Sequence, residues 1–216
     1  MNDELSPFEY SIYQNVIIKT VILFVYRRLS SWRDNPYRTQ KTGEVELTSD
    51  LVTYLSKNAH NDEQNFLFNH EEPQPDGYRI DFAAYPTGKE DDYTKKITVF
   101  ECKRLPAPSP NRTNEYVIGK LGGIQRFKLE KHGANHEIVG MVGYIQSSAI
   151  EDNLGKINDC ITDLYSETND GILNWKEDKV LTVIESDISM GICHSLSIHH
   201  RITLNPITIH HLWIVL

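Results

Sequence analysis

Residues 75–103, PDGYRIDFAAYPTGKEDDYTKKITVFECK, decide the fold of this chain. The stretch contains two apolar runs, residues 78–85 and 97–103, separated by a polar segment. This pattern predicts two strands joined by a loop. Side chains alternate between the faces of a strand, which places Glu101 and Lys103 together on one face. Burying an acid and a lysine at the end of an apolar strand is costly unless they are paired or bind a metal. This pair therefore marks a candidate site.

A second acid, Asp81, lies inside the first of the two predicted strands. Asp81, followed by Glu101-Cys102-Lys103 at the end of an apolar strand, resembles the D…(D/E)xK motif of the restriction-endonuclease-like nucleases, the PD-(D/E)XK superfamily. The resemblance implies that Asp81 and Glu101 bind Mg²⁺, together with a backbone carbonyl near Cys102. It also implies that Lys103 positions or activates the attacking water.

Two alternative interpretations of these acids stay open. Asp76 directly follows Pro75, so these two residues match the Pro-Asp dipeptide in the name of the motif. However, Asp76 is followed by Gly77, and Asp-Gly pairs are common in turns, so Asp81 is the preferred ligand. The Glu101 and Lys103 pair is also explained by an ordinary surface ion pair, because E-x-K occurs by chance in most proteins of this size.

A helix is predicted over residues 43–57, ahead of the first strand. Its buried side carries the leucines Leu47, Leu51 and Leu55. Glu44 falls on this side and Glu46 on the polar side, because residues two apart point about 200° apart around a helix. Related nucleases often carry a glutamate on this helix, so the resemblance adds Glu44 to the site, holding a second ion or a water. A first-turn acid favoured by the helix dipole is the alternative.

The segment after the motif supplies the candidate contacts to nucleic acid. Residues 113–132 predict a helix in which Gly122 and Gly123 allow a backbone to approach closely, either the sheet or a nucleic-acid strand. Related nucleases often place a polar residue on this helix, pointing at the metal and the scissile phosphate. The candidates for nucleic-acid binding are Arg104, Lys120, Gln125 and Arg126.

The charge distribution supports contact with phosphate at one place on an otherwise acidic protein. The net charge is −8, which argues against a general polyanion binder. Residues 27–41 contain five basic residues and one acid, and residues 101–131 contain seven basic residues and three acids, so each carries a local charge of +4. Solvated helix faces would give the same pattern, and this alternative is stronger for the first segment.

Length and composition indicate a single globular domain in a reducing compartment. The chain has 216 residues, of which 39% are hydrophobic and 24% charged. Its three cysteines stand far apart, which favours neither a zinc motif nor a disulfide framework and fits a cytoplasmic protein. The acidic N-terminus differs from a signal peptide. The most apolar run, residues 16–26, is shorter than the ~20 residues that span a bilayer, so we expect a buried helix and no membrane contact.

We expect one α/β domain over residues 1–216 with a restriction-endonuclease-like core, in which helices flank a central mixed sheet. Residues 1–40 form an extra N-terminal helix (residues 6–33), 43–147 the catalytic core, and 148–216 a helix and C-terminal strands. The N-terminal helix either packs into the core or forms the interface of a homodimer.

Further strands are predicted at residues 65–70, 137–146, 179–186, 192–202 and 207–216. A helix capped by Ser148 and Glu151 is predicted to reach residue 167. Adjacent histidines at 199–200 and 210–211 point to opposite strand faces, so we interpret them as packed or solvent-facing side chains.

The function implied by the resemblance is Mg²⁺-dependent hydrolysis of phosphodiester bonds, with Mn²⁺ able to replace Mg²⁺. The expected substrate is DNA rather than RNA, and the expected role is an endonuclease in restriction or phage defence. No P-loop, nucleophile-elbow or H-E-x-x-H motif occurs, so ATPase, serine-hydrolase and zincin functions have no support. The alternative function is a catalytically inactive domain of the same fold that binds nucleic acid or a protein.

Overall fold

The structure is a computed structural model. It describes residues 7–38, 40, 42–74, 77–88, 94–107, 112, 114–119, 122–165, 173–176 and 178–216. Asp76 and Lys120, two of the residues considered for the site, lie outside these ranges.

The protein is an α/β protein in which seven strands form one mixed sheet. The helices are α1 (Pro7–Arg33), α2 (Glu44–Asn61), α3 (Gly123–Lys128) and α4 (Ile150–Asp163). The strands are β1 (Phe66–Pro73), β2 (Arg79–Pro86), β3 (Thr98–Leu105), β4 (Ile138–Ile145), β5 (Lys179–Asp187), β6 (Ile192–His199) and β7 (Ile207–Val215). Their order in the sheet is β1-β2-β3-β4-β7-β6-β5. The expected central mixed sheet flanked by helices is therefore present.

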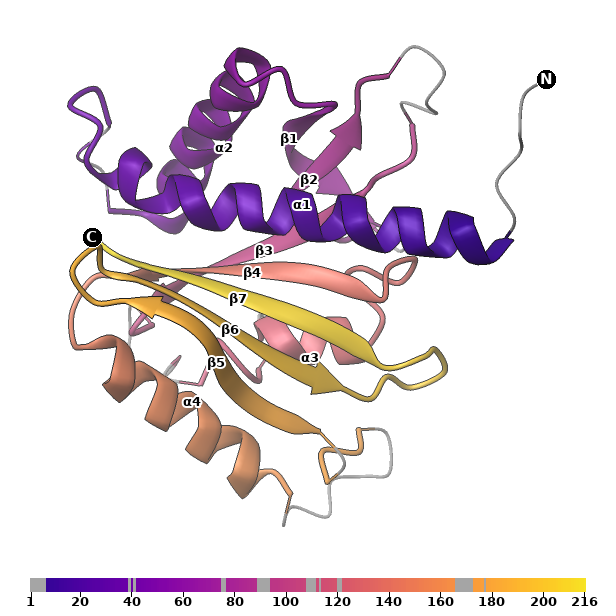
Figure 1. Ribbon diagram of the computed structural model, residues 1–216. Coiled ribbons are helices and arrows are strands. Elements are labelled where there is room, and N and C mark those ends of the chain that lie inside the picture. Colours follow the sequence, from indigo (N-terminus) through magenta and orange to yellow (C-terminus); the bar gives the residue numbers. More distant parts are fainter. Residues whose placement is uncertain are drawn as a thin grey trace.

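The sheet separates two layers of helices, and each layer encloses its own apolar core. Helices α1 and α2 cover one face, and α3 and α4 lie on the other (Figure 1). Strand β4 runs parallel to both of its neighbours, β3 and β7, at the centre of the sheet. Seven of its eight residues are buried, which confirms the prediction that near-continuous hydrophobicity here marks a strand covered on both faces.

Helix α1 is part of the core rather than an appendage to it. Its side chains that pack into the core shared with α2 and the sheet are Val21, Ile22, Val25, Tyr26, Leu29 and Trp32. The indole of Trp32 also donates a hydrogen bond of 2.8 Å to Asp50 on α2. The apolar run at 16–26 thus packs into the core of this chain from Val21 onward, as one of its two interpretations predicted, whereas Val16 is exposed. None of the helices that the structure describes is long and apolar enough to cross a membrane.

The predicted helix over residues 113–132 is wrong: of the described residues in this range, only Gly123–Lys128 are helical, and residues 114–119 form turns. The chain reverses tightly ahead of α3, where Gly123 N donates to Glu115 O at 3.0 Å. A Cβ atom on Gly122 would lie 2.5 Å from the carbonyl carbon of Ile118. The glycines therefore permit close approach of this chain's own backbone, and in Gly123's case also of Met141 on β4.

The capping box predicted at Ser148 and Glu151 is also wrong. Helix α4 begins at Ile150, and Ala149 is its N-cap residue without a side-chain hydrogen bond. Ser148 has a φ of +72°, and its hydroxyl accepts a hydrogen bond from Asn153 Nδ2 at 2.9 Å. The hydroxyl is thus engaged by a side chain of the helix instead of by the N-terminal amides, and the helix ends at Asp163 rather than near residue 167.

Candidate functional site

The site lies where strands β2 and β3 part from each other. Their paired residues end at Phe82 and Phe100, which stack with ring centroids 4.5 Å apart. One step beyond, the carboxylate of Asp81 accepts a hydrogen bond of 2.6 Å from the backbone N–H of Cys102. Asp81 therefore replaces the missing main-chain partner of β3, which gives this acid a structural role whatever its chemistry.

Glu101 and Lys103 form a buried ion pair on the face of β3 opposite Cys102. Their closest atoms, Lys103 Nζ and Glu101 Oε1, lie 2.7 Å apart, and both side chains are buried. Lys103 Nζ also donates to the backbone carbonyl of Cys102 at 2.9 Å. Cys102 packs in the core under α1 and α2, and Val99 packs in the core on the other face. The predicted alternation along β3 is confirmed, and the surface ion-pair interpretation is excluded.

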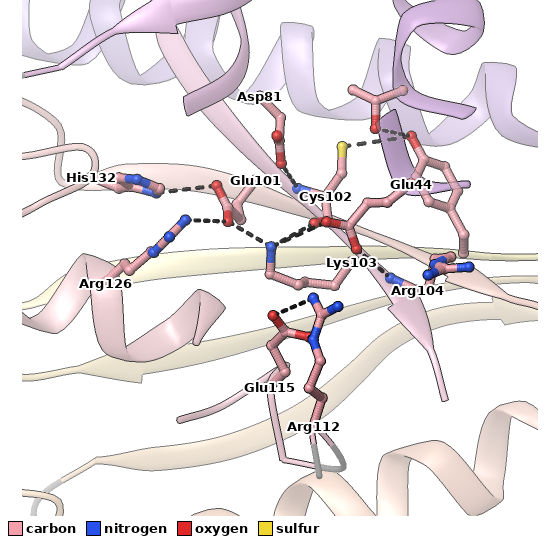
Figure 2. A network of polar contacts seen from close by, with 12 residues as sticks. Glu44, Asp81, Glu101, Cys102, Lys103, Arg104, Arg112, Glu115, Arg126 and His132 are labelled. Carbon is pink, nitrogen blue, oxygen red and sulfur yellow. Dashed lines mark hydrogen bonds and ion pairs between the residues drawn. The ribbon is translucent and has the colours of Figure 1, made fainter. Parts of the chain in front are cut away.

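Helix α2 places the side chain of Glu44 against the end of β3 (Figure 2). Glu44 Oε2 accepts a hydrogen bond of 3.0 Å from the backbone N–H of Arg104, and Oε1 lies 3.6 Å from Lys103 Nζ. Glu46 is exposed, and the three predicted leucines of α2 are fully buried. The helical phase that points Glu44 inward and Glu46 outward is confirmed.

Two further basic side chains contact Glu101. Arg126 Nη1 lies 3.4 Å from Glu101 Oε1, and His132 Nδ1 lies 3.1 Å from Oε2 (Figure 2). His132 is fully buried, with the rings of Tyr78 and Phe127 at centroid distances of 6.3 and 6.0 Å. Sequence reasoning missed His132, because a single histidine in a polar turn belongs to no periodic pattern.

The residues predicted to bind nucleic acid have different positions and partners in the structure. Arg126 joins the site through Glu101, as described above. Arg104 Nη1 donates to the carbonyl of Thr42 at 3.3 Å, and Gln125 Oε1 accepts from the N–H of Gly119 at 2.7 Å. Arg104 and Gln125 thus brace the loops beside the site, while Lys120 lies outside the described residues.

The two acids of the motif differ in their electrostatic environment. Burial, followed by the charge of Glu101, raises the pKa of Asp81 to about 8. Burial also opposes the charge of Glu101, but Lys103 and His132 outweigh it and lower the pKa of that carboxyl. Burial likewise opposes the charge of Lys103, and Glu101, Glu44 and Asp81 raise its pKa. At neutral pH without metal, Glu101 is ionised and Asp81 is mostly protonated.

Replacing Asp81 with Asn is expected to stabilise the metal-free protein at neutral pH, and by more as the pH rises from about 4 to about 8. The folded-state pKa of Asp81 lies above its unfolded value of 3.8, so ionisation of this group removes stability across that interval. Asparagine keeps an acceptor for the Cys102 N–H and carries no charge. Thermal unfolding in EDTA at pH 5 and pH 8 measures the effect, and a variant that is less stable than wild type at pH 8 would contradict it.

The donor types at the site fit a hard divalent cation. Carboxylate oxygens of Asp81 and Glu101 and the carbonyl of Cys102 are oxygen ligands, and Mg²⁺ keeps several waters, so few protein ligands suffice. In the structure each of these groups has a partner within the protein. Asp81 accepts from the Cys102 N–H, Glu101 contacts three basic side chains, and the Cys102 carbonyl accepts from Lys103 Nζ. Among the described residues, no three His, Cys, Asp or Glu side chains are grouped closely enough to hold a metal.

A second buried polar network extends from Lys128 to Trp213 on the same side of the sheet. Lys128 Nζ lies 2.6 Å from Asp178 Oδ2, and Asp178 Oδ2 is 3.0 Å from His199 Nδ1. The chain of contacts continues through Ser197, His211 and Tyr116 to the indole N–H of Trp213, in steps of 2.7–2.9 Å. The packed interpretation of His199 and His211 is confirmed, because both are fully buried.

The two ends of this network fix the direction of its hydrogen bonds, because the Asp178 carboxylate only accepts and the Trp213 indole only donates. Burial lowers the pKa of His199 and of His211, so each ring is neutral and donates from one nitrogen only. Tyr116 therefore accepts from Trp213 and donates to His211 Nδ1. His211 then donates from Nε2 to Ser197, which donates to His199 Nε2, and His199 donates from Nδ1 to Asp178. Asp178, His199 and Ser197 follow each other as in a hydrolytic triad, but the Ser197 side chain is fully buried and cannot meet a substrate.

Comparison with known protein families, with curated proteins and with solved structures finds no match to this chain. The class that fold and geometry define is therefore an α/β protein with a seven-stranded mixed sheet and a buried cluster of acids and cations at the end of β3. Its function has to be argued from that cluster.

Proposed function

We propose that this protein is a Mg²⁺-dependent nuclease of the restriction-endonuclease-like type, with DNA as its substrate. One observation carries the proposal: Glu44 and Glu101, far apart in the sequence, lie 3.6 and 2.7 Å from Lys103 Nζ where β2 and β3 part, and Asp81 bonds the backbone N–H of the adjacent Cys102. The preference for DNA over RNA and a role in restriction or phage defence come from the sequence resemblance alone.

The residues of the cluster have distinct roles in this proposal. Asp81, Glu101 and the carbonyl of Cys102 would hold the metal, which acidifies a bound water and neutralises phosphate charge. Lys103 orients the attacking water or stabilises the phosphate, because its ammonium is a compact charge on a flexible stem. Arg126, which contacts Glu101 through Nη1, would bind a phosphate oxygen through its remaining N–H groups. Glu44 fixes the end of β3 and faces Lys103.

A second candidate function is a non-catalytic domain that binds nucleic acid or a protein. Its support is the saturation of Glu101, whose two oxygens already contact Lys103, Arg126 and His132. A net charge of −8 also suits a protein partner better than a polyanion. A purely structural ion-pair cluster needs no metal, so the two functions differ in cation dependence.

The discriminating experiment incubates the full chain with linear and circular double-stranded DNA, single-stranded DNA and RNA. Each substrate is tested with Mg²⁺, with Mn²⁺ and with EDTA. The nuclease proposal expects cleavage that requires the divalent cation and is lost in the Glu101→Gln variant. Cleavage of no substrate, together with no heat of Mg²⁺ or Mn²⁺ binding in calorimetry, would leave the non-catalytic function.

Glu44→Gln is expected to slow cleavage by about tenfold to a hundredfold, whereas Glu46→Gln should change the rate less than twofold. Glu44 is the carboxylate that faces Lys103 and receives the Arg104 N–H, and Glu46 is exposed at the same helix end. The two variants remove the same charge from the same helical turn and so control for each other. Single-turnover rates under saturating Mg²⁺ measure the effect, and equal rates would remove Glu44 from the mechanism.

A further inference from the structure

The ammonium of Lys103 lies at the centre of the oxygen donors of the site. It is 2.7 Å from Glu101 Oε1, 2.9 Å from the Cys102 carbonyl oxygen and 3.6 Å from Glu44 Oε1 (Figure 2). The first two oxygens belong to groups that the proposed function assigns to the metal. A lysine that only positions water beside a metal does not have to occupy these donors.

We propose that Lys103 is the resident counter-ion of the metal-free site, and that a divalent cation binds by displacing its ammonium from Glu101 and the Cys102 carbonyl. This inference rests on the proposed function. The same lone pairs cannot serve an ammonium and a metal ion together, and two cations at such distances in a buried site repel each other strongly. The lysine therefore competes with the metal for its ligands.

The surrounding residues make this exchange feasible. Arg126 and His132 contact Glu101 independently of Lys103, so the carboxylate stays in place when the ammonium leaves. Glu44 Oε1 stands 3.6 Å from the ammonium and offers it the nearest other carboxylate. Glu44 then has a defined part in the exchange: it holds the displaced lysine beside the metal, where the lysine can meet the phosphate.

The test is calorimetric titration of the folded full chain with MgCl₂ and with MnCl₂, without nucleic acid. Lys103→Met removes the charge and keeps the length of the side chain, and it is expected to bind each metal about tenfold more tightly than wild type. Lys131→Met is the matched control. It makes the same change in net charge beside the site, since Lys131 adjoins His132 and its ammonium lies 5.1 Å from the ring centroid of Tyr78. The control is expected to keep wild-type affinity.

The possible results separate this inference from the proposed function. Unchanged or weaker metal binding by Lys103→Met overturns the inference, and the proposed function stands when wild type still binds metal and cleaves DNA. If neither wild type nor Lys103→Met binds either metal, both fail. Metal binding by Lys103→Met alone would show that no metal displaces the ammonium in the wild-type protein, which overturns both the exchange and the proposed function. Lys103→Gln repeats the test should the methionine variant not fold, and circular dichroism establishes folding for each variant.

Discussion

Replacing Glu101 with Gln is expected, under the proposed function, to reduce Mg²⁺-dependent DNA cleavage by about a thousandfold or more, because the variant loses a charged group proposed to bind the metal and no neighbouring side chain replaces it. Glu101 is the best positioned acid of the site: it is ionised, buried and held at both oxygens. Single-turnover cleavage of a labelled DNA duplex, compared at saturating Mg²⁺, gives the ratio of rates.

The same substitution is also expected to lower stability, in contrast to Asp81→Asn. Removing the Glu101 charge leaves Lys103, Arg126 and His132 facing one another without their shared anion. Removing one partner of a buried ion pair costs about 3–5 kcal/mol, so a fall of several kcal/mol in the free energy of unfolding is expected.

Glu137→Gln is a suitable control, because this exposed acid lies just ahead of β4 and away from the cluster. It should change neither activity nor stability appreciably. A Glu101→Gln protein that cleaves at the wild-type rate would remove this acid from catalysis. A variant that gains stability would show that Lys103, Arg126 and His132 do not need the Glu101 charge.

The sequence alone did not predict that substitutions of Asp81 and Glu101 would change stability in opposite directions. The motif presents Asp81 and Glu101 as equivalent ligands, whereas the structure surrounds Glu101 with Lys103, Arg126 and His132 and gives Asp81 one backbone N–H. Their environments depend on side chains from three separate segments, and the alternation pattern of one strand carries no information about such partners.

Local patterns did predict which way the principal side chains face. Alternation along β3 placed Glu101 with Lys103, and the leucine spacing of α2 placed Glu44 inward, because both follow from the period of one element. The turns before α3 were missed because the glycine pair was interpreted within a helix. Whether Gly122 sits in a helix or at a reversal depends on where the backbone of Ile118 passes, and this is a property of the folded chain.

Long-range contacts were beyond prediction for a related reason. Tyr116 and His211 meet across 95 residues of sequence because β7 lies beside β4 in the sheet, and nothing local sets that strand order. Lys128 illustrates the same point. It was counted in a basic segment that suited phosphate contact, yet its side chain is fully buried against Asp178.

Replacing Lys128 with Met is therefore expected to destabilise the protein by about 3–5 kcal/mol, the usual effect of breaking a buried ion pair from one side. Lys128 Nζ donates to Asp178 and to the carbonyls of Asn174 and His200, at 2.6–2.8 Å. Three acceptors require three N–H groups, so the side chain is an ammonium, even though burial lowers its pKa. Methionine fills the volume but leaves the Asp178 charge and both carbonyls without this donor.

Chemical denaturation at pH 7 measures the change in the free energy of unfolding, with Lys131→Met as the control. Lys131 is three residues further along and only half-buried, so its substitution should stay within about 0.5 kcal/mol of wild type. Lys128→Met is expected to keep the cleavage mechanism, because its side chain faces Asp178 and the β6 end rather than Glu101. A loss below about 1 kcal/mol would mean that Asp178 is already stabilised sufficiently by His199 and the His200 N–H, whose bonds of 3.0 and 2.8 Å remain in the variant.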